Sequence, residues 1–297
     1  MGRWNLSVYV FSFAFGCASR TTPPTSVAQT ATPGGPADRD DEQDSEEEQP
    51  QSLPEGFDRE AALAQAERIG AALYRQDKLA WWASDALFAD AAFPRGVVMA
   101  GWTVDLHEDG RVHFFSRSDE EVRWMATVDC GASGPKSCIV KFLAPTAAPT
   151  PEQSVILRAR RTAHESAEFV PKTDRYNEVV LPAQLYGHGD GWLVYLLAAS
   201  LDSNVMMLGG HYRFIVSADG GEVESARELT KSLLAMPKME NSAAAVVSHV
   251  LDPVPIETHV WASLLYEQPL FVTTSTGLYE VDRGRISASA PGVVPQG

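Results

Sequence analysis

The stretch VVMAGWTVDLHEDGRVHFF, residues 97–115, decides the fold. Its centre, Glu108-Asp109-Gly110, is a tight-turn sequence, and the flanks Val97–Leu106 and Arg111–Phe115 are rich in β-branched and aromatic residues. A short turn that contains glycine between two such runs is typical of a β-hairpin. The sequence therefore predicts two antiparallel strands here.

A second hairpin follows the first along the chain. Glu121–Cys130 and Cys138–Leu143 are strand-like, and the turn-rich loop Gly131–Ser137 lies between them. Four consecutive strands joined by short turns predict an antiparallel meander.

Helical periodicity precedes and follows the meander. Apolar residues recur at positions 63, 66, 69 and 73, and a second helical stretch carries aromatic side chains at 81, 82 and 88 before Pro94. We therefore expect an N-terminal helical pair. Glu152–Phe169, which starts after Pro151, predicts one central helix.

Short strands resume after the central helix. A brief helical or irregular piece, Lys231–Met236, interrupts them. The predicted strands are Glu178–Tyr186, Trp192–Ala199, Gly210–Ser217, Val223–Thr230, Thr258–Tyr266, Leu270–Thr274, Leu278–Val281 and Arg285–Ala288.

These elements predict an α+β fold of largely antiparallel sheet, with roughly ten strands. We expect residues 57–290 to form a single α+β domain, with a possible subdivision near residues 145–151, where three prolines cluster. Residues 291–297 are expected to be a disordered tail.

The first sixteen residues have the layout of a secretory signal peptide. Arg3 precedes the apolar run Trp4–Phe15, which is too short to span a bilayer stably, and small residues follow it.

Ala14-Phe15-Gly16-Cys17 resembles the lipobox of bacterial lipoproteins, mainly through Gly16 and Cys17; Ala14 stands where that family usually has leucine. The resemblance implies cleavage before Cys17 and a lipid anchor on its sulfur, with diacylglycerol and acyl chains such as palmitate. From the residues themselves two alternatives stay open. One is a secreted protein cut after Gly16 or Ala18, and the other is an uncleaved, disordered apolar start.

Residues 17–56 have the composition of a disordered tether. Runs rich in threonine, proline and glycine come first, and residues 38–48 then hold eight acidic side chains against Arg39, a net charge of −7. Such a segment cannot bury enough apolar area to offset its chain entropy, so we expect it to link the lipid to the domain flexibly.

The chain has three cysteines. If Cys17 carries lipid, Cys130 and Cys138 remain as one pair across the loop of the second hairpin. A disulfide there would stabilise the domain by about 2–3 kcal/mol. Two reduced cysteines that face each other are the alternative, and no histidine or third cysteine stands nearby at a spacing that suits a metal.

The charge of the domain is acidic. The formal net charge of the chain is −15, and −10 remains for residues 49–297 once the −7 of the tether and the +2 of Arg3 and Arg20 are removed. This balance argues against nucleic acid and against direct adhesion to anionic lipid as partners.

Motifs that would identify a reaction are absent from the sequence. It contains no G-x-S-x-G elbow, no Walker A loop, no H-E-x-x-H, no C-x-x-C and no EF-hand loop. We therefore expect neither a metal nor another cofactor, and an enzyme is disfavoured.

Two histidines are candidates for chemistry. His259 lies in a run predicted as a strand, on which Glu257, His259 and Trp261 would share a face as a carboxylate-oriented base beside an apolar wall. His211 opens another strand, whose Arg213 shares its face, so this second row could bind an anion or a carboxylate. A solvated sheet face or a buried, hydrogen-bonded histidine is the alternative in each case.

His107 and His113 bracket the first hairpin turn and could hold a metal together with Glu108 or Asp109. Ordinary surface turn residues are the alternative.

The segment Gly209–Phe214, together with Asp219-Gly220, resembles the strand–turn–strand cores of uncharacterised proteobacterial envelope proteins. That resemblance implies no activity.

The function predicted is that of an envelope lipoprotein whose domain is a non-catalytic binding or assembly module. Its partners would be a membrane, through the lipid, and an envelope protein or peptide. The outer membrane is favoured over the inner one, with the domain in the periplasm or at the cell surface. The alternative is a periplasmic hydrolase that uses His211 or His259 with Glu257.

Overall fold

The structure of this chain is a computed structural model that describes residue 53 and residues 55–118, 121–131, 134–238 and 244–289. The predicted signal peptide, Cys17, residues 17–52 of the tether and the tail 291–297 lie outside the described residues. Three helices and fourteen strands make up the described part, which is an α+β fold of mostly antiparallel sheet, as predicted.

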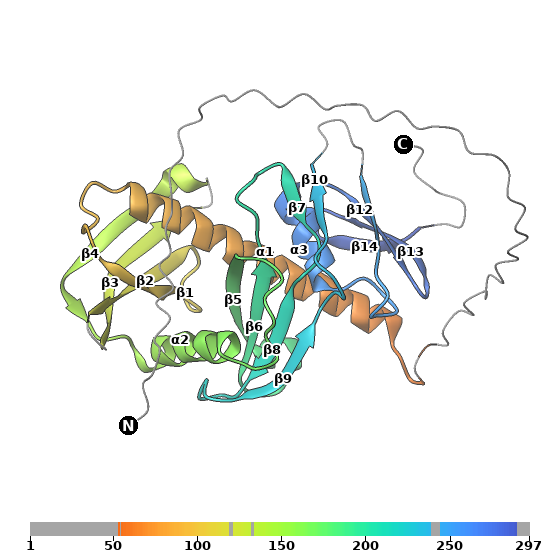
Figure 1. The fold of residues 1–297 in the computed structure, drawn as a ribbon, viewed down its shortest axis with the longest axis horizontal. Coiled ribbons are helices and arrows are strands. Elements are labelled where there is room, and N and C mark those ends of the chain that lie inside the picture. Colours follow the sequence, from red (N-terminus) through yellow and green to blue (C-terminus); the bar gives the residue numbers. More distant parts are fainter. Residues whose placement is uncertain (1–52, 54, 119–120, 132–133, 239–243, 290–297) are drawn as a thin grey trace, which may run out of the picture. The chain divides into compact units, whose positions relative to one another are not determined.

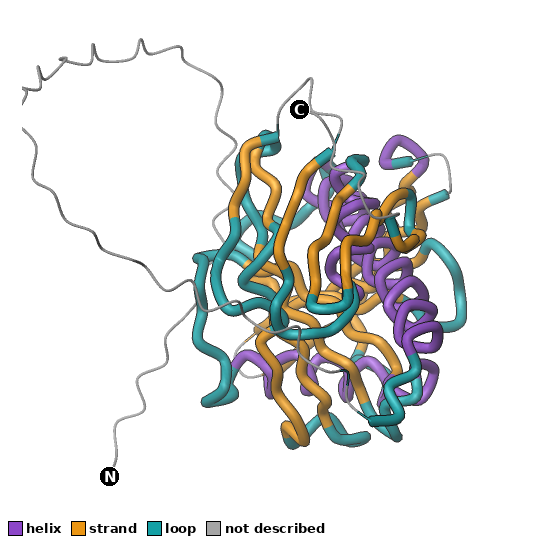
Figure 2. The backbone as a smooth tube through the Cα atoms, turned by 90° about the vertical axis from the view of Figure 1, so that its right-hand side faces the viewer, coloured by secondary structure: helices purple, strands orange, loops and turns teal. Residues whose placement is uncertain are grey.

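One long helix, α1 (Arg59–Ala89), contacts strands of all three four-stranded sheets (Figures 1 and 2). The two helical stretches of the sequence are the two ends of this single helix. Asp77 breaks the apolar pattern between them, yet it continues the buried stripe, because its Oδ2 accepts a hydrogen bond from Trp261 Nε1 at 3.0 Å. A carboxylate with a buried partner therefore takes the place of an apolar residue.

The predicted meander is confirmed. Its strands pair in sequence order, and the C-terminal half of α1 covers one face of the sheet through residues such as Ala83 and Leu87, which pack against Val112 and Phe114. The strands are β1 (Val98–Val104), β2 (Arg111–Ser118), β3 (Glu121–Cys130) and β4 (Cys138–Ala147).

The central sheet is covered on both faces. On β6, Leu193 and Tyr195 face α1 and α3, whereas Val194 and Leu196 face α2 (Pro151–His164). This arrangement explains why β6 is apolar along its whole length. The sheet runs in the order β5 (Tyr176–Pro182), β6 (Trp192–Ala198), β8 (Tyr212–Val216), β9 (Val223–Glu228), all antiparallel.

Two smaller sheets complete the fold. In the third four-stranded sheet, β11 pairs with β12 in parallel and the other pairs are antiparallel. Its strands are β11 (Ala245–Ser248), β12 (Leu270–Thr274), β13 (Gly277–Asp282) and β14 (Arg285–Ala288). In the two-stranded sheet, β7 (Val205–Met207) pairs with β10 (Ala235–Pro237). Strand β10 overlaps Lys231–Met236, which the sequence predicted to be helical or irregular.

The strand predicted over Thr258–Tyr266 is wrong, because this run is helix α3 (Glu257–Tyr266). Every residue from Glu257 to Ser263 is buried. A helix that is buried all round has no polar face, so its periodicity does not distinguish it from a buried strand.

The proline-rich segment near residues 145–151 contains the end of β4 and the start of α2, and both lie in the same compact unit. Two 3-10 turns, Pro135–Ser137 and Ala183–Tyr186, complete the described elements. None of the three helices in the described part is both long and apolar enough to cross a bilayer.

Candidate functional site

Four of the five predicted site residues meet between β8 and α3. Arg213 Nη1 lies 2.8 Å from Glu257 Oε1, and the ring of His211 stands edge to face against Trp261, with 5.2 Å between centroids. Glu257 and Trp261 are four residues apart on α3, so they lie on the same face of the helix. His211 and Arg213 face α3 together, whereas Tyr212 faces α2, as the alternation along a strand predicts.

The Arg213–Glu257 ion pair is buried, and a third side chain, Tyr195, also binds Glu257. Tyr195 donates its hydroxyl to Glu257 Oε1 at 2.9 Å. Burial alone would lower the pKa of Arg213, but the Glu257 carboxylate outweighs it and the pKa is raised. Burial and the same carboxylate raise the pKa of Tyr195 well above its usual value. Both raised pKa values mean that Arg213 and Tyr195 keep their protons.

His259 does not join the predicted row with Glu257 and Trp261, because on a helix the residue two positions along points elsewhere. Its Nδ1 accepts a hydrogen bond from the backbone N–H of Ile256 at 3.0 Å. The ring thus caps the start of α3.

His211 and His259 share a geometry that works against general-base chemistry. His211 Nδ1 accepts from the backbone N–H of Ala198 at 2.9 Å, as His259 Nδ1 does from Ile256. In a neutral imidazole whose Nδ1 is an acceptor, Nε2 carries the proton, so neither ring has a free lone pair to take another. Burial lowers the pKa of His211 to about 4 and that of His259 to about 3.

A third buried histidine was not singled out from the sequence. His249 Nε2 lies 2.8 Å from Asp252 Oδ2, and its ring is 4.8 Å from that of His259. Arg227 contacts both oxygens of Asp252 at 2.6 Å. Although burial alone would raise it, the pKa of Asp252 is lowered to about 2 by His249 and Arg227. In the sequence, the one indication of this pair was that His249 and Asp252 stand three residues apart, just before Pro253.

A cleft of about 240 Å³ lies on the other side of the fold, between the meander and the start of α2. The meander face opposite α1 carries polar residues there, which pair across the strands as Thr103, His113, Thr127 and Lys141. The cleft is lined by Thr103, Val104, Asp105, Leu106, His107, Arg111, His113, Trp124, Thr150, Glu152, Gln153 and Ile156.

His107 and His113, which the sequence offered only as an alternative metal site, both line this cleft, but they contact different carboxylates. His113 is buried between Asp105 Oδ2 at 3.1 Å and Thr127 Oγ1 at 3.2 Å, whereas the exposed His107 lies 3.3 Å from Glu152. Within the described ranges no group of three or more side chains is placed to hold a metal. The alternative metal site at His107 and His113 is therefore not formed by the described residues.

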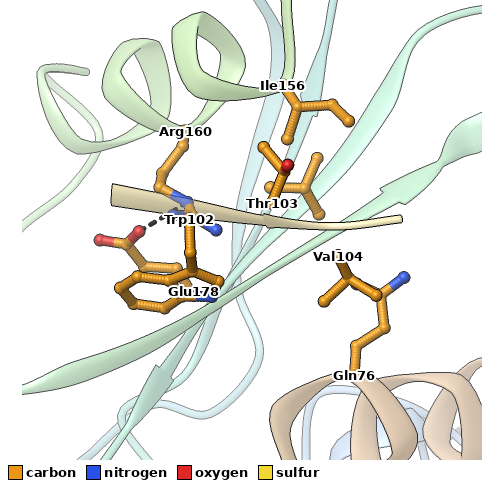
Figure 3. A pocket seen from close by; sticks show the side chains of 8 residues that line it. Gln76, Trp102, Thr103, Val104, Ile156, Arg160 and Glu178 are labelled. Carbon is orange, nitrogen blue, oxygen red and sulfur yellow. Dashed lines mark ion pairs between the residues drawn. The ribbon is translucent and has the colours of Figure 1, made fainter. Parts of the chain in front are cut away.

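A smaller hollow of about 10 Å³ adjoins the cleft and shares Thr103, Val104 and Ile156 with it. Figure 3 shows Arg160 beside Trp102 and paired with Glu178, at 2.7 Å between Arg160 Nε and Glu178 Oε2. Burial lowers the pKa of Arg160, while the buried Glu178 works in the opposite direction.

Two buried polar atoms at these hollows, Thr103 Oγ1 and Arg160 Nη1, have no hydrogen-bond partner within the described part of the chain. Unsatisfied buried polar atoms are rare in folded proteins, so they mark where a further partner fits. Of the residues that line the cleft, the sequence analysis had singled out His107 and His113 as candidate site residues. Comparison of this chain with protein-family models, with curated proteins and with solved structures finds no match.

Proposed function

We propose that this chain is an exported, lipid-anchored envelope protein whose domain is a non-catalytic binding module. The observation that carries the proposal is the disulfide between Cys130 and Cys138. Disulfides persist in oxidising compartments such as the bacterial periplasm. With this pair joined, Cys17 is the one cysteine of the three left for a lipid.

The use of the buried histidines supports binding rather than catalysis. The Nδ1 atoms of His211 and His259 accept hydrogen bonds from backbone N–H groups. The carboxylate of Glu257 accepts hydrogen bonds from Arg213 and Tyr195. These contacts fix the start of α3 against β8. The cleft beside α2, with its unsatisfied hydroxyl at Thr103, is the place where a ligand fits instead.

Intact mass of the full chain, purified from the membranes of a bacterial host, tests the anchor. We expect a chain that begins at Cys17 and carries the added mass of a diacylglycerol and an acyl group. The Cys17→Ser variant should lose this mass and leave the membrane fraction, whereas Ser19→Ala, two residues further on, should behave as wild type. A chain cut after Ala18, or one that keeps Met1 and no lipid, would refute the anchor.

A hydrolysis assay with ester, amide and glycoside substrates tests the second half of the proposal. We expect no turnover above that of the His211→Gln variant. Turnover that disappears in His211→Gln or His259→Gln, while the fold is retained by circular dichroism, would establish the hydrolase instead.

A further inference from the structure

We propose that the cleft between the meander and α2 binds an alkylammonium group, such as the end of a lysine side chain or of a free diamine. This inference rests on the proposed binding function and names the chemistry of the ligand. Three independent features of the cleft support it: the sign of its charge, an unsatisfied acceptor at its base and an apolar, aromatic wall.

The charge around the cleft is negative. Four carboxylates stand against two cations, an excess of two negative charges with the histidines counted as neutral. Arg111, the arginine that lines the cleft, is neutralised by Asp129 and Glu108, each at 2.6 Å. The carboxylates are Asp105 and Glu152, which line the cleft, and Glu108 and Asp129, which contact Arg111; the cations are Arg111 and Lys141.

The start of α2 does not reverse this sign. A helix N-terminus carries the equivalent of roughly half a positive charge, less than the full charges of the carboxylates beside it. Its first turn is also capped, because Thr150 Oγ1 accepts from Gln153 N, and Gln153 Oε1 accepts from Thr150 N. An anionic ligand would thus meet the carboxylates with little compensation.

The base of the cleft offers an acceptor. Thr103 is 1% exposed, and its Oγ1 has no hydrogen-bond partner within the described residues. Asp105 contributes charge but no free oxygen, since it accepts from His107 N, Glu108 N and His113. An ammonium group has three donors and no acceptor, so Thr103 Oγ1 and the Glu152 carboxylate suit it.

The mouth of the cleft can open without a large loss of stability. Among the described residues, His107 is the one ion-pair partner of Glu152, and both side chains are well exposed, at 44% for Glu152 and 76% for His107. Exposed ion pairs of this kind contribute little. An incoming ammonium can therefore replace His107 beside Glu152.

The walls suit the methylene chain that carries an ammonium. Val104, Leu106 and Ile156 are apolar, and Trp124 completes the lining. The indole N–H of Trp124 is already donated to the Ala126 carbonyl at 3.1 Å. The ring also stands edge to face with that of His113, with 4.7 Å between centroids. Beyond that contact, indole offers apolar packing and cation–π attraction, which is strongest for this side chain.

Fluorine NMR of the full chain in detergent, labelled with 5-fluorotryptophan, tests the proposal. The chain has seven tryptophans, and the Trp124→Phe variant identifies the resonance of Trp124. The probes are 1,5-diaminopentane and trilysine, with 1,5-pentanediol and glutarate as uncharged and anionic controls. We expect the two amines to shift the Trp124 resonance saturably, less so at high salt, and the two controls to leave it unchanged.

Two variants separate the parts of the site. Glu152→Gln should weaken amine binding roughly three- to tenfold, and Thr103→Val should weaken it to a similar extent. Glu165→Gln, which removes one exposed negative charge at the opposite end of α2, is the matched control and should leave the affinity within error of wild type.

Saturation by trilysine alone identifies a basic peptide as the source of the ammonium, and saturation by the diamine as well identifies the amine itself. No saturable shift with either amine, an equal shift with pentanediol, or equal effects of Glu152→Gln and Glu165→Gln would overturn the inference. A lipidated chain that fails to bind amines would leave the proposed anchor intact, so the two failures are distinguishable.

Discussion

The buried hydroxyl of Thr103 does not stabilise the fold. Its hydroxyl is buried in the sheet face between β1 and α2 without a partner in the described part of the chain, and such a group costs free energy relative to an apolar side chain of the same shape. Its cross-strand neighbour is His113, which is bonded instead to Thr127. The two threonines therefore differ in what their hydroxyl groups contribute.

Thr103→Val should raise the free energy of unfolding by about 1 kcal/mol, because it removes an unsatisfied buried hydroxyl and keeps the shape. Thr127→Val should lower it by a similar amount, since His113 Nδ1 then loses its partner. Urea denaturation of both variants measures the difference. A loss of stability in Thr103→Val would contradict the view that its hydroxyl has no partner in the folded protein.

Buried titratable side chains predict how stability depends on pH. Burial lowers the pKa of His211 to about 4 and that of His259 to about 3, from 6.5, so the unfolded chain takes up protons there first as the pH falls. Burial raises the pKa of Asp77 from 3.8 to about 6, so this group favours the folded state over part of the same range. The two histidine rings destabilise the folded state as the pH falls, and the carboxyl of Asp77 stabilises it. Because two groups oppose one, the free energy of unfolding should fall between pH 6 and pH 4.

The expected slope is about 1.4 kcal/mol per pH unit for one proton. Urea denaturation at half-unit steps from pH 7 to pH 4 measures it. His259→Gln should flatten the profile, since one of the two opposing rings is gone. Stability that is constant or rises toward pH 4 would argue against neutral buried rings.

At the scale of elements, α1 and α3 pack closely where Gly70 of α1 meets α3. A Cβ at Gly70 would lie 2.5 Å from Val260 Cβ and 2.6 Å from the carbonyl oxygen of Glu257. A glycine in a helix interior is unfavourable by about 1 kcal/mol relative to alanine, so its presence here reflects packing. The position of α3 then brings Glu257 and Trp261 to β8 and Asp77.

Gly70→Ala should destabilise the protein by about 1–3 kcal/mol, because the clash outweighs the gain in helix propensity. Thermal unfolding followed by circular dichroism measures the effect. Ala71→Ser at the neighbouring exposed position is the control and should change stability little. A more stable Gly70→Ala variant would mean that the helices separate easily.

Elements whose pattern is local were predictable. The bounds of Leu270–Thr274 and Arg285–Ala288 agree with the prediction, and the meander follows from its turns. The helix Glu257–Tyr266 was taken for a strand because its residues are buried on every side. Local pattern also separated the two ends of α1, since the partner that keeps Asp77 buried lies 184 residues away.

The candidate sites were predictable in the same measure. The shared face of His211 and Arg213 follows from strand alternation, and the structure has it. That this face meets Glu257 and Trp261 depends on a helix the sequence did not reveal. The role of Thr103 could not be predicted from the sequence, because whether its hydroxyl finds a partner depends on how the folded chain packs around it.

At the scale of the whole molecule, α1 makes the sheets into one unit. Leu73 packs in the core with α3 and the central sheet, and Leu87 packs in the core of the meander. Neither core can lose the helix without exposing apolar surface in the other. The domain should therefore unfold as one cooperative body.

Leu73→Ala and Leu87→Ala should each lower stability by about 2–5 kcal/mol and keep a single transition. Circular dichroism and tryptophan fluorescence, followed against urea, should give coincident curves for both variants. Transitions that separate in Leu87→Ala but not in Leu73→Ala would mean that the meander unfolds independently.

The length of α1 also sets the order of events during folding. Its contacts reach 184 residues along the chain to Trp261 and 219 residues to Ile286. The apolar stripe of α1 is therefore covered only when the last described elements have been synthesised. Non-local contacts of this kind slow folding and leave apolar surface exposed meanwhile. Such a chain reaches its native state only after the whole domain has been made, so a copy that lacks its C-terminal strands should expose the apolar stripe of α1.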